Sequence, residues 1–165
     1  MKDSTDNALQ QEAARFIDGF CSVCLATVSE AGLPHASYAP FVRDDMGCFY
    51  IYVSELATHG QNLLAGSSVS LLFVEGEQQA AQIYARKRFT LHCDPQQLKV
   101  DGEGWAAAMV RMEQAHGKVI SVLKTLDFHL FRLTPESGNY VRGFGKSDSF
   151  SKEELRQIVR LPSHP

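Results

Sequence analysis

Four segments of the chain carry apolar residues at helical spacing. In the first, residues three and four positions apart form one apolar stripe between Asp6 and Phe20. The longest such pattern begins at Gly104 and runs to Leu123. Near the end, the Ser-x-x-Glu sequence at Ser151 is a capping box, which is typical of a helix start. We therefore expect helices over 6–20, 55–64, 104–123 and 151–159.

Between these helices, short runs rich in β-branched and aromatic residues are typical of strands. The first three runs are joined by turns too short for parallel crossovers, so they are expected to pair antiparallel. Asp94-Pro95 is expected to end one strand, and a turn over Pro135–Gly138 is expected to separate two others. The expected strands cover 22–28, 35–42, 48–53, 69–74, 88–93, 128–133 and 140–144. This pattern predicts an α+β, predominantly β fold built on a closed or nearly closed antiparallel β-barrel with flanking helices.

The composition is that of one globular domain comprising residues 1–165. A length of 165 residues suits a single domain, and a hydrophobic fraction of 44% is enough to bury a core. Within this domain, 1–20 is assigned to an N-terminal helix and 151–165 to a C-terminal helix and tail. The sequence contains no repeat and no low-complexity linker.

Charge and targeting signals narrow the function classes. The formal net charge is −3, so neither a nucleic acid nor a membrane is expected as a partner. No apolar stretch approaches the ~18–20 residues that span a bilayer, and the polar N-terminus lacks the apolar centre of a secretory signal. We therefore expect a cytoplasmic protein with reduced, structural thiols at Cys21, Cys24, Cys48 and Cys93.

The segment after the third strand run combines a helix start with hydroxyl and imidazole groups. Ser54 can cap this helix, whose free N–H groups and positive dipole end suit an anion. Thr58 and His59 fall one turn further on and would extend the site. A capped surface helix without a ligand explains the same residues, and the local sequence alone favours that simpler interpretation.

Three consecutive cations, Arg86, Lys87 and Arg88, lie at the start of a later strand. On a strand, Arg86 and Arg88 share one face while Lys87 points away. Two convergent guanidinium groups suit a phosphate or a carboxylate, which they can bind by paired hydrogen bonds. The alternative is a solvated edge strand protected by its charges.

Most histidines show no metal-ligand spacing such as H-x-x-x-H and are more typical of core or surface positions than of ligands. His164 differs because it lies in a Pro-flanked tail that could close over a pocket. A nucleophile elbow, a phosphate-binding glycine loop and a dinucleotide fingerprint are all absent.

Three blocks read LATVSEAGLPHASYAPF, FYIYVSELATHGQNLLAGSSVSLLF and ARKRFTL, and a later stretch reads DFHLFRLTPESGNYVRGFGKS. The first three resemble the FMN-binding split-barrel superfamily related to pyridoxamine 5′-phosphate oxidase. The last, followed by a short helix and a His-bearing tail, resembles the haem-utilisation branch of that superfamily, the HugZ-type haem-degrading proteins. The resemblance covers nearly the whole chain, 24–164. It implies a split barrel and a homodimer with ligand pockets at the subunit interface.

For FMN, the resemblance implies a site that this sequence matches in part. A basic residue on the helix after the third strand holds the FMN phosphate in relatives, and here that position is His59. A neutral imidazole attracts a dianion less than a permanent cation does. Ser54 and Thr58 would assist, and Arg86 and Arg88 fall on the strand that supplies arginine to this ligand. The expected contacts with the flavin ring are Ser37, Tyr38 and Ala39.

For haem, the resemblance implies an iron ligand near the C-terminus and an acidic residue at the start of a late strand. These roles carry over to His164 and Asp127. The carboxylate would fix the tautomer of the ligating imidazole. Arg86 or Arg88, together with Lys87, would pair with the haem propionates or with bound oxygen.

Three functions follow from this resemblance. The leading hypothesis is a haem-binding protein that degrades haem oxidatively and releases iron. The first alternative is an FMN-dependent oxidoreductase of the same fold, and the second is a haem carrier that leaves the ligand intact. Uncovered apolar strand surface on a barrel of 18.3 kDa also favours pairing with a second copy.

Overall fold

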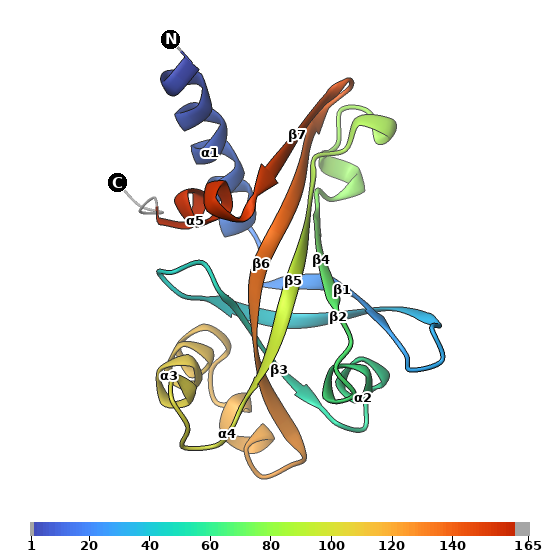
Figure 1. Ribbon diagram of the computed structural model, residues 1–165, viewed down its shortest axis with the longest axis vertical. Helices are drawn as coiled ribbons and strands as arrows, with labels where there is room; N and C mark the ends of the chain where they lie inside the picture. Colours follow the sequence, from blue (N-terminus) through green and yellow to red (C-terminus); the bar gives the residue numbers. More distant parts are fainter. Residues whose placement is uncertain (1, 161–165) are drawn as a thin grey trace.

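The computed structural model describes residues 2–160, with side chains described for residues 7–158. Its seven strands form one antiparallel sheet in the order β3-β2-β1-β4-β5-β6-β7, and a further β3–β6 pairing closes the first six into a barrel. Figure 1 shows β7 continuing beyond this barrel alongside β6. The strands are β1 Ser22–Val28, β2 Pro34–Arg43, β3 Phe49–Ser54, β4 Val69–Val74, β5 Arg88–Leu98, β6 Phe128–Gly143 and β7 Lys146–Ser151. The predicted antiparallel split barrel is confirmed.

Helices flank the barrel at both ends (Figure 1). They are α1 Lys2–Asp18, α2 Thr58–Leu64, α3 Trp105–His116, α4 Val119–Leu123 and α5 Lys152–Arg160, with short 3₁₀ turns η1 Glu77–Gln79 and η2 Ile83–Ala85. The α5 start confirms the capping box, since the Ser151 hydroxyl and backbone N–H each donate to Glu154 Oε2 at 2.7 Å. No helix within residues 2–160 is both long and apolar enough to cross a membrane.

The barrel interior is an aromatic core. Phe41, Phe49 and Phe73 lie with ring centroids 5.4–5.7 Å apart, the spacing at which tilted and edge-on aromatic pairs attract. Helices α1 and α5 extend this core through the fully buried side chains of Ala13 and Ile158. A second, smaller core packs α3 and α4 against the outside of β3 and β6, and it contains Tyr50, Met109, Met112, Ile120 and Leu130.

Strand β6 corrects the predicted turn over Pro135–Gly138. The strand is continuous because it changes partner: its first part pairs with β3 and its second part with β7, while β5 pairs along its whole length. Pro135 lies at the register shift between these parts, where a residue without an N–H is tolerated. A Cβ on Gly138 would lie 2.8 Å from Leu91 Cδ2, so glycine here serves close packing rather than a turn.

Three further expectations change for local reasons. Pro95 does not end β5. Beyond Cys93 the strand pairs only with β6, so its other edge forms no strand hydrogen bonds and a residue without an N–H is tolerated there. The predicted helix over 104–123 is divided at Gly117, whose φ of 75° lies in the left-handed region. Strand β7 was not predicted, since Phe150 is its one buried residue and the apolar pattern is correspondingly weak.

Candidate ligand-binding site

The three predicted cations lie at the start of β5, and they differ in how far the protein already engages them. Arg86 donates from Nε to the Glu75 carbonyl at 3.0 Å, contacts the same oxygen through Nη2, and lies 3.5 Å from Glu77 Oε1. Arg88 donates to the Arg86 carbonyl at 3.0 Å and forms no ion pair with any described residue. Arg88 is therefore the cation of this group with most capacity left for a ligand.

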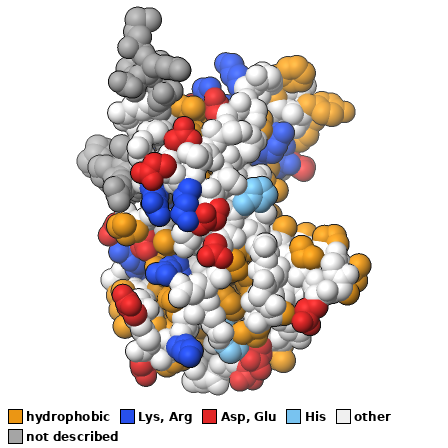
Figure 2. Space-filling view, in the orientation of Figure 1, with side chains coloured by type: hydrophobic (Ala, Val, Ile, Leu, Met, Phe, Trp, Pro, Cys, Tyr) orange, Lys and Arg blue, Asp and Glu red, His pale blue; other side chains and the backbone are white. Residues whose placement is uncertain are grey.

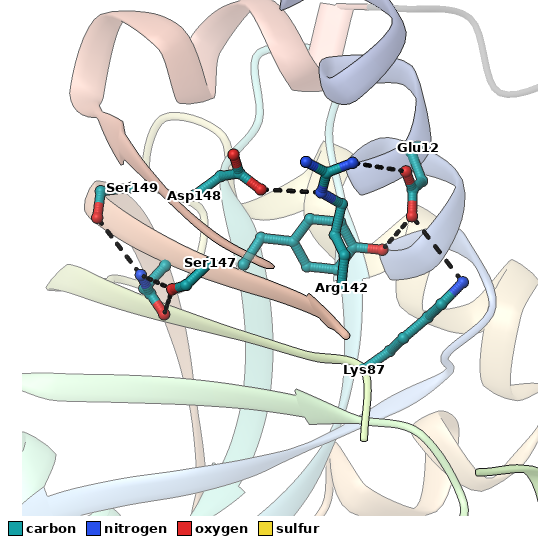
Figure 3. A network of polar contacts seen from close by, with 8 residues as sticks. Glu12, Lys87, Arg142, Ser147, Asp148 and Ser149 are labelled. Carbon is teal, nitrogen blue, oxygen red and sulfur yellow. Dashed lines mark hydrogen bonds and ion pairs between the residues drawn. The ribbon is translucent and has the colours of Figure 1, made fainter. Parts of the chain in front are cut away.

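Lys87, the residue before β5, belongs to a network that also includes groups from α1, β6 and β7 (Figure 3). Its Nζ lies 3.9 Å from Glu12 Oε1, and the same carboxylate group accepts the Tyr140 hydroxyl at 3.3 Å and faces Arg142 Nη1 at 3.7 Å. Asp148 accepts from Arg142 Nε at 2.8 Å, and this hydrogen bond raises the pKa of Arg142. Burial, and then Glu12, raise the pKa of Tyr140.

An uncovered sheet surface extends from the cations across β4, β1 and β2. We call it the outer face, and we define it by Cys24, Ala26, Val28, Ala36, Tyr38, Ser70, Leu72, Thr90 and His92. Tyr38, Cys24, Leu72 and Thr90 lie in one register row, about 14 Å across at the usual strand spacing. Arg88 lies two residues beyond Thr90, so the outer face ends in a cation.

The outer face is mainly apolar and partly to fully exposed, and one part of it is hollowed. Tyr38 is 62% exposed and Val28 45% exposed. A cavity of about 560 Å³ opens on this face beside Ala26, Ser70 and His92, and the Ser70 hydroxyl lies 2.8 Å from His92 Nδ1. Figure 2 shows a hollow in the right-hand outline of the molecule, between the β1–β2 hairpin below and the η1 and η2 turns above.

The three predicted ring contacts on β2 do not share one surface. Tyr38 belongs to the outer face, whereas Ser37 and Ala39 point to the opposite side of the strand. Ala39 is 2% exposed and belongs to the barrel core. The Ser37 hydroxyl oxygen is buried without a hydrogen-bond partner among the described side chains and backbone.

The corner between β3 and α2 holds Ser54, Thr58 and His59. Ser54 does not cap α2: its hydroxyl accepts from the Leu56 N–H at 3.1 Å, and the helix begins at Thr58 after an N-cap residue without a side-chain bond. The helix has seven residues, so it offers little dipole for an anion. Burial, and then the neighbouring His35, lower the pKa of His59. The lowered pKa disfavours the imidazolium form, so His59 offers a phosphate less positive charge than a lysine or an arginine would.

Asp127 lies beside this corner. Its carbonyl accepts from the Glu55 N–H at 3.0 Å, and its side chain is exposed. Two residues further along the chain, His129 lies 2.7 Å from Glu55 Oε2 through Nε2 and 3.1 Å from Gln97 Nε2 through Nδ1. Sequence reasoning missed the Glu55–His129–Gln97 contact because its members come from three separate elements, and no local motif marks it.

Apart from Ser37, Tyr38 and Ala39 on β2, the described site residues that the sequence predicts form two groups within one chain. Ser54, Thr58, His59 and Asp127 lie near α2, where β4 begins, and Arg86–Arg88 lie where β4 ends (Figure 1). Strand β4 runs between the two groups, and at the usual rise per residue its ends, Val69 and Val74, are about 17 Å apart. His164 lies outside the described residues.

Comparison with known proteins adds family relationships to this geometry. A family model described as pyridoxamine 5′-phosphate oxidase matches residues 9–142. The haem oxygenase HutZ of Vibrio cholerae is 37% identical over 154 residues, which cover 93% of this chain and 87% of HutZ. A crystal structure of HutZ, described there as a haem storage protein, has a TM-score of 0.71 at 37% identity over 76% of this chain and 88% of that one.

Two further structures share the fold at appreciable identity. ChuZ of Campylobacter jejuni has a TM-score of 0.79 at 32% identity and covers 90% of this chain, which spans 61% of the ChuZ chain. A haem-binding protein of Mycobacterium smegmatis has a TM-score of 0.78 at 25% identity, over 90% of this chain and 60% of that one.

Proposed function

Because the chain belongs to the pyridoxamine 5′-phosphate oxidase family, and within it to the HugZ-type split-barrel branch, we propose that it binds haem and degrades it oxidatively, releasing iron. The observation that carries this proposal is the outer face with Arg88 at its edge. Its apolar row suits a flat macrocycle, and a guanidinium without a carboxylate partner suits a propionate. The 37% identity to a haem oxygenase over 93% of the chain supports the same ligand.

In this proposal the residues of the chain hold and orient the haem. Arg88 pairs with a propionate, and Lys87 and Arg86 add positive charge nearby. His164 in the tail supplies the imidazole ligand, and the Asp127 carboxylate accepts a hydrogen bond from its other ring nitrogen. Bound haem supplies the oxygen chemistry itself, with an external reductant providing electrons.

We further propose that the active form is a homodimer. The outer face exposes apolar side chains on three adjacent strands, and a second copy would remove them from water. A dimer also accounts for the separation of Asp127 from Arg88 within one chain, because a pocket between subunits can draw one group from each. The free cysteines are consistent with a cytoplasmic location.

Two alternatives have specific support. A haem storage role follows the description given to the HutZ crystal structure. An FMN-dependent oxidoreductase follows from the family and from Arg88, but the lowered pKa of His59 argues against a firm grip on the FMN phosphate.

The test is titration of the purified protein with ferric haem, followed by ascorbate in air. We expect a saturable Soret band that bleaches while a ferrous chelator detects released iron. A Soret band that persists under these conditions would identify a storage protein. A flavin spectrum as purified, with diffuse haem adsorption, would identify the FMN oxidoreductase.

Variants then assign the residues. We expect His164→Ala to change the ferric haem spectrum, Asp127→Asn to shift its pH dependence, and Arg88→Gln to weaken haem binding. Arg15→Gln, an exposed cation on α1, is the matched control and should behave as wild type. An unchanged spectrum in His164→Ala would remove that residue from the site.

A further inference from the structure

A second cavity lies on another part of the molecule, between the end of α1, the end of β2, and α3. Its volume is about 440 Å³, within the range of roughly 300–1,000 Å³ that is usual for small-molecule sites. Its apolar lining includes Ile17, Phe41 and Ala115, and its polar lining includes Arg43, Arg111 and His116. We call it the Arg43 pocket. It shares no lining residue with the outer face or with the cavity on it.

The Arg43 guanidinium is only partly satisfied. Its Nη2 forms an ion pair with Asp18, while Nη1 is buried without a hydrogen-bond partner among the described groups. The side chain is 12% exposed, and its burial lowers the pKa of Arg43. A buried charged donor without an acceptor is costly and calls for an explanation. A ligand with an acceptor group would satisfy Nη1.

The unpaired guanidinium donor, rather than the net charge around it, favours an anionic acceptor. The charged lining groups are Arg43, Arg111 and Asp18. Asp44 also acts on Arg43, but its carboxylate already accepts from the Tyr50 hydroxyl at 2.7 Å and from the Cys48 backbone N–H at 2.9 Å. Arg111 pairs with Asp45 at 3.1 Å, but that carboxylate is 90% exposed and competes weakly with a ligand held in the pocket. His116 lies 3.0 Å from the Phe41 carbonyl through Nε2 and must donate there, since a carbonyl only accepts.

We propose that the Arg43 pocket binds a small amphipathic carboxylate, with its head group on Arg43 and Arg111 and its apolar body against Ile17, Phe41 and Ala115. Guanidinium groups bind carboxylates by directed, charge-assisted hydrogen bonds, which suits the unpaired Nη1. The apolar lining supplies the remaining binding energy by removing the ligand body from water. This ligand is distinct from haem.

Calorimetric titration of the full-length protein with octanoate, and in parallel with the neutral octanamide, tests this pocket. We expect saturable octanoate binding at one site per chain and at least tenfold weaker binding of octanamide. Arg43→Met keeps an unbranched side chain of roughly similar length but removes the guanidinium. This variant should bind octanoate at least tenfold more weakly. Equal affinity for octanoate and octanamide would overturn the proposal.

Arg43→Met also removes the ion pair with Asp18 and could lower binding by destabilising the fold, so a second variant that leaves this pair intact is needed. Ala115→Trp fills the pocket from an exposed position on α3 and should abolish octanoate binding, whereas Ala107→Trp, exposed on the same helix outside the pocket, should not. Haem binding should be unchanged in Ala115→Trp. Octanoate binding that survives Ala115→Trp would show that the ligand lies elsewhere and would also overturn the proposal.

Discussion

Glu55 and His129 join the β3–α2 corner to the start of β6 through a contact of 2.7 Å between Oε2 and Nε2. The Gln97 amide nitrogen can only donate, so the His129 Nδ1 that it contacts at 3.1 Å is the acceptor. In its neutral form His129 therefore carries its proton on Nε2 and donates it to Glu55. The backbone of Asp127 is fixed to the same corner, because its carbonyl accepts from the Glu55 N–H.

A double-mutant cycle on this pair measures its strength. We expect Glu55→Ala and His129→Ala to couple by about 0.5 kcal/mol in the free energy of unfolding, a small value because the side chains are 44% and 27% exposed. Urea unfolding provides the measurement. A parallel cycle that combines Glu55→Ala with His92→Ala, on the outer face, is the control and should show additive effects. Additive effects in the Glu55–His129 cycle as well would mean that this contact contributes nothing to stability.

Gly60→Ala tests how α2 is positioned. Alanine favours a helix over glycine by about 1 kcal/mol, but a Cβ here would lie 2.0 Å from the Ser54 carbonyl oxygen, which is backbone and cannot move aside. We expect the clash to prevail, with a net destabilisation of roughly 1–3 kcal/mol in urea unfolding.

Gly143→Ala is the control for that substitution, because no atom lies within 4 Å of a Cβ added there. A Gly60→Ala protein as stable as wild type would mean that α2 can move away from β3. In that case His59 would have no fixed position relative to Ser54.

The Glu12 network predicts a loss of stability at alkaline pH. The folded protein has a raised pKa at Tyr140, through burial and Glu12, so it retains this proton after the unfolded chain has lost it. The free energy of unfolding should therefore fall as the pH rises above about 10, the ordinary tyrosine pKa. Four other thiol and phenol groups also have raised pKa values in the folded protein and add to this fall in stability, namely Cys48, Tyr50, Tyr52 and Cys93.

Urea unfolding between pH 8 and 11 measures this slope. Tyr140→Phe should make it shallower without abolishing it, since the other raised groups remain. Tyr84→Phe removes a phenol that is 83% exposed and should leave the slope as in wild type. Identical slopes in wild type and Tyr140→Phe would contradict the proposed retention of the proton.

The outer face predicts the oligomeric state. Wild-type protein at micromolar concentration should sediment at twice 18.3 kDa, and Ala26→Arg should convert it to a monomer by placing a charge at the centre of the buried surface. Val122→Arg alters another exposed apolar position, on α4 and 60% exposed, and this variant should remain dimeric. A wild-type monomer would remove the pocket between subunits.

Local sequence determined most of the elements and the closed antiparallel sheet. Val69–Val74 and Ser22–Val28 agree to the residue, because their apolar runs are bounded by polar turns. The family could also be identified from the sequence blocks alone, and with it the expected ligands. Local rules failed at Pro95, where the strand lacks a second neighbour, and at Pro135, where the pairing register shifts.

Only the tertiary structure decided how the candidate residues are grouped. Arg86 and Arg88 are equivalent in sequence, yet the Glu75 carbonyl and Glu77 engage the first and leave the second available for a ligand. Ser37 and Tyr38 are neighbours in the chain but face opposite sides of β2. The Glu55–His129 contact joins residues 74 positions apart. Such relationships depend on which strands meet when the barrel closes, and that is a property of the whole chain rather than of any segment.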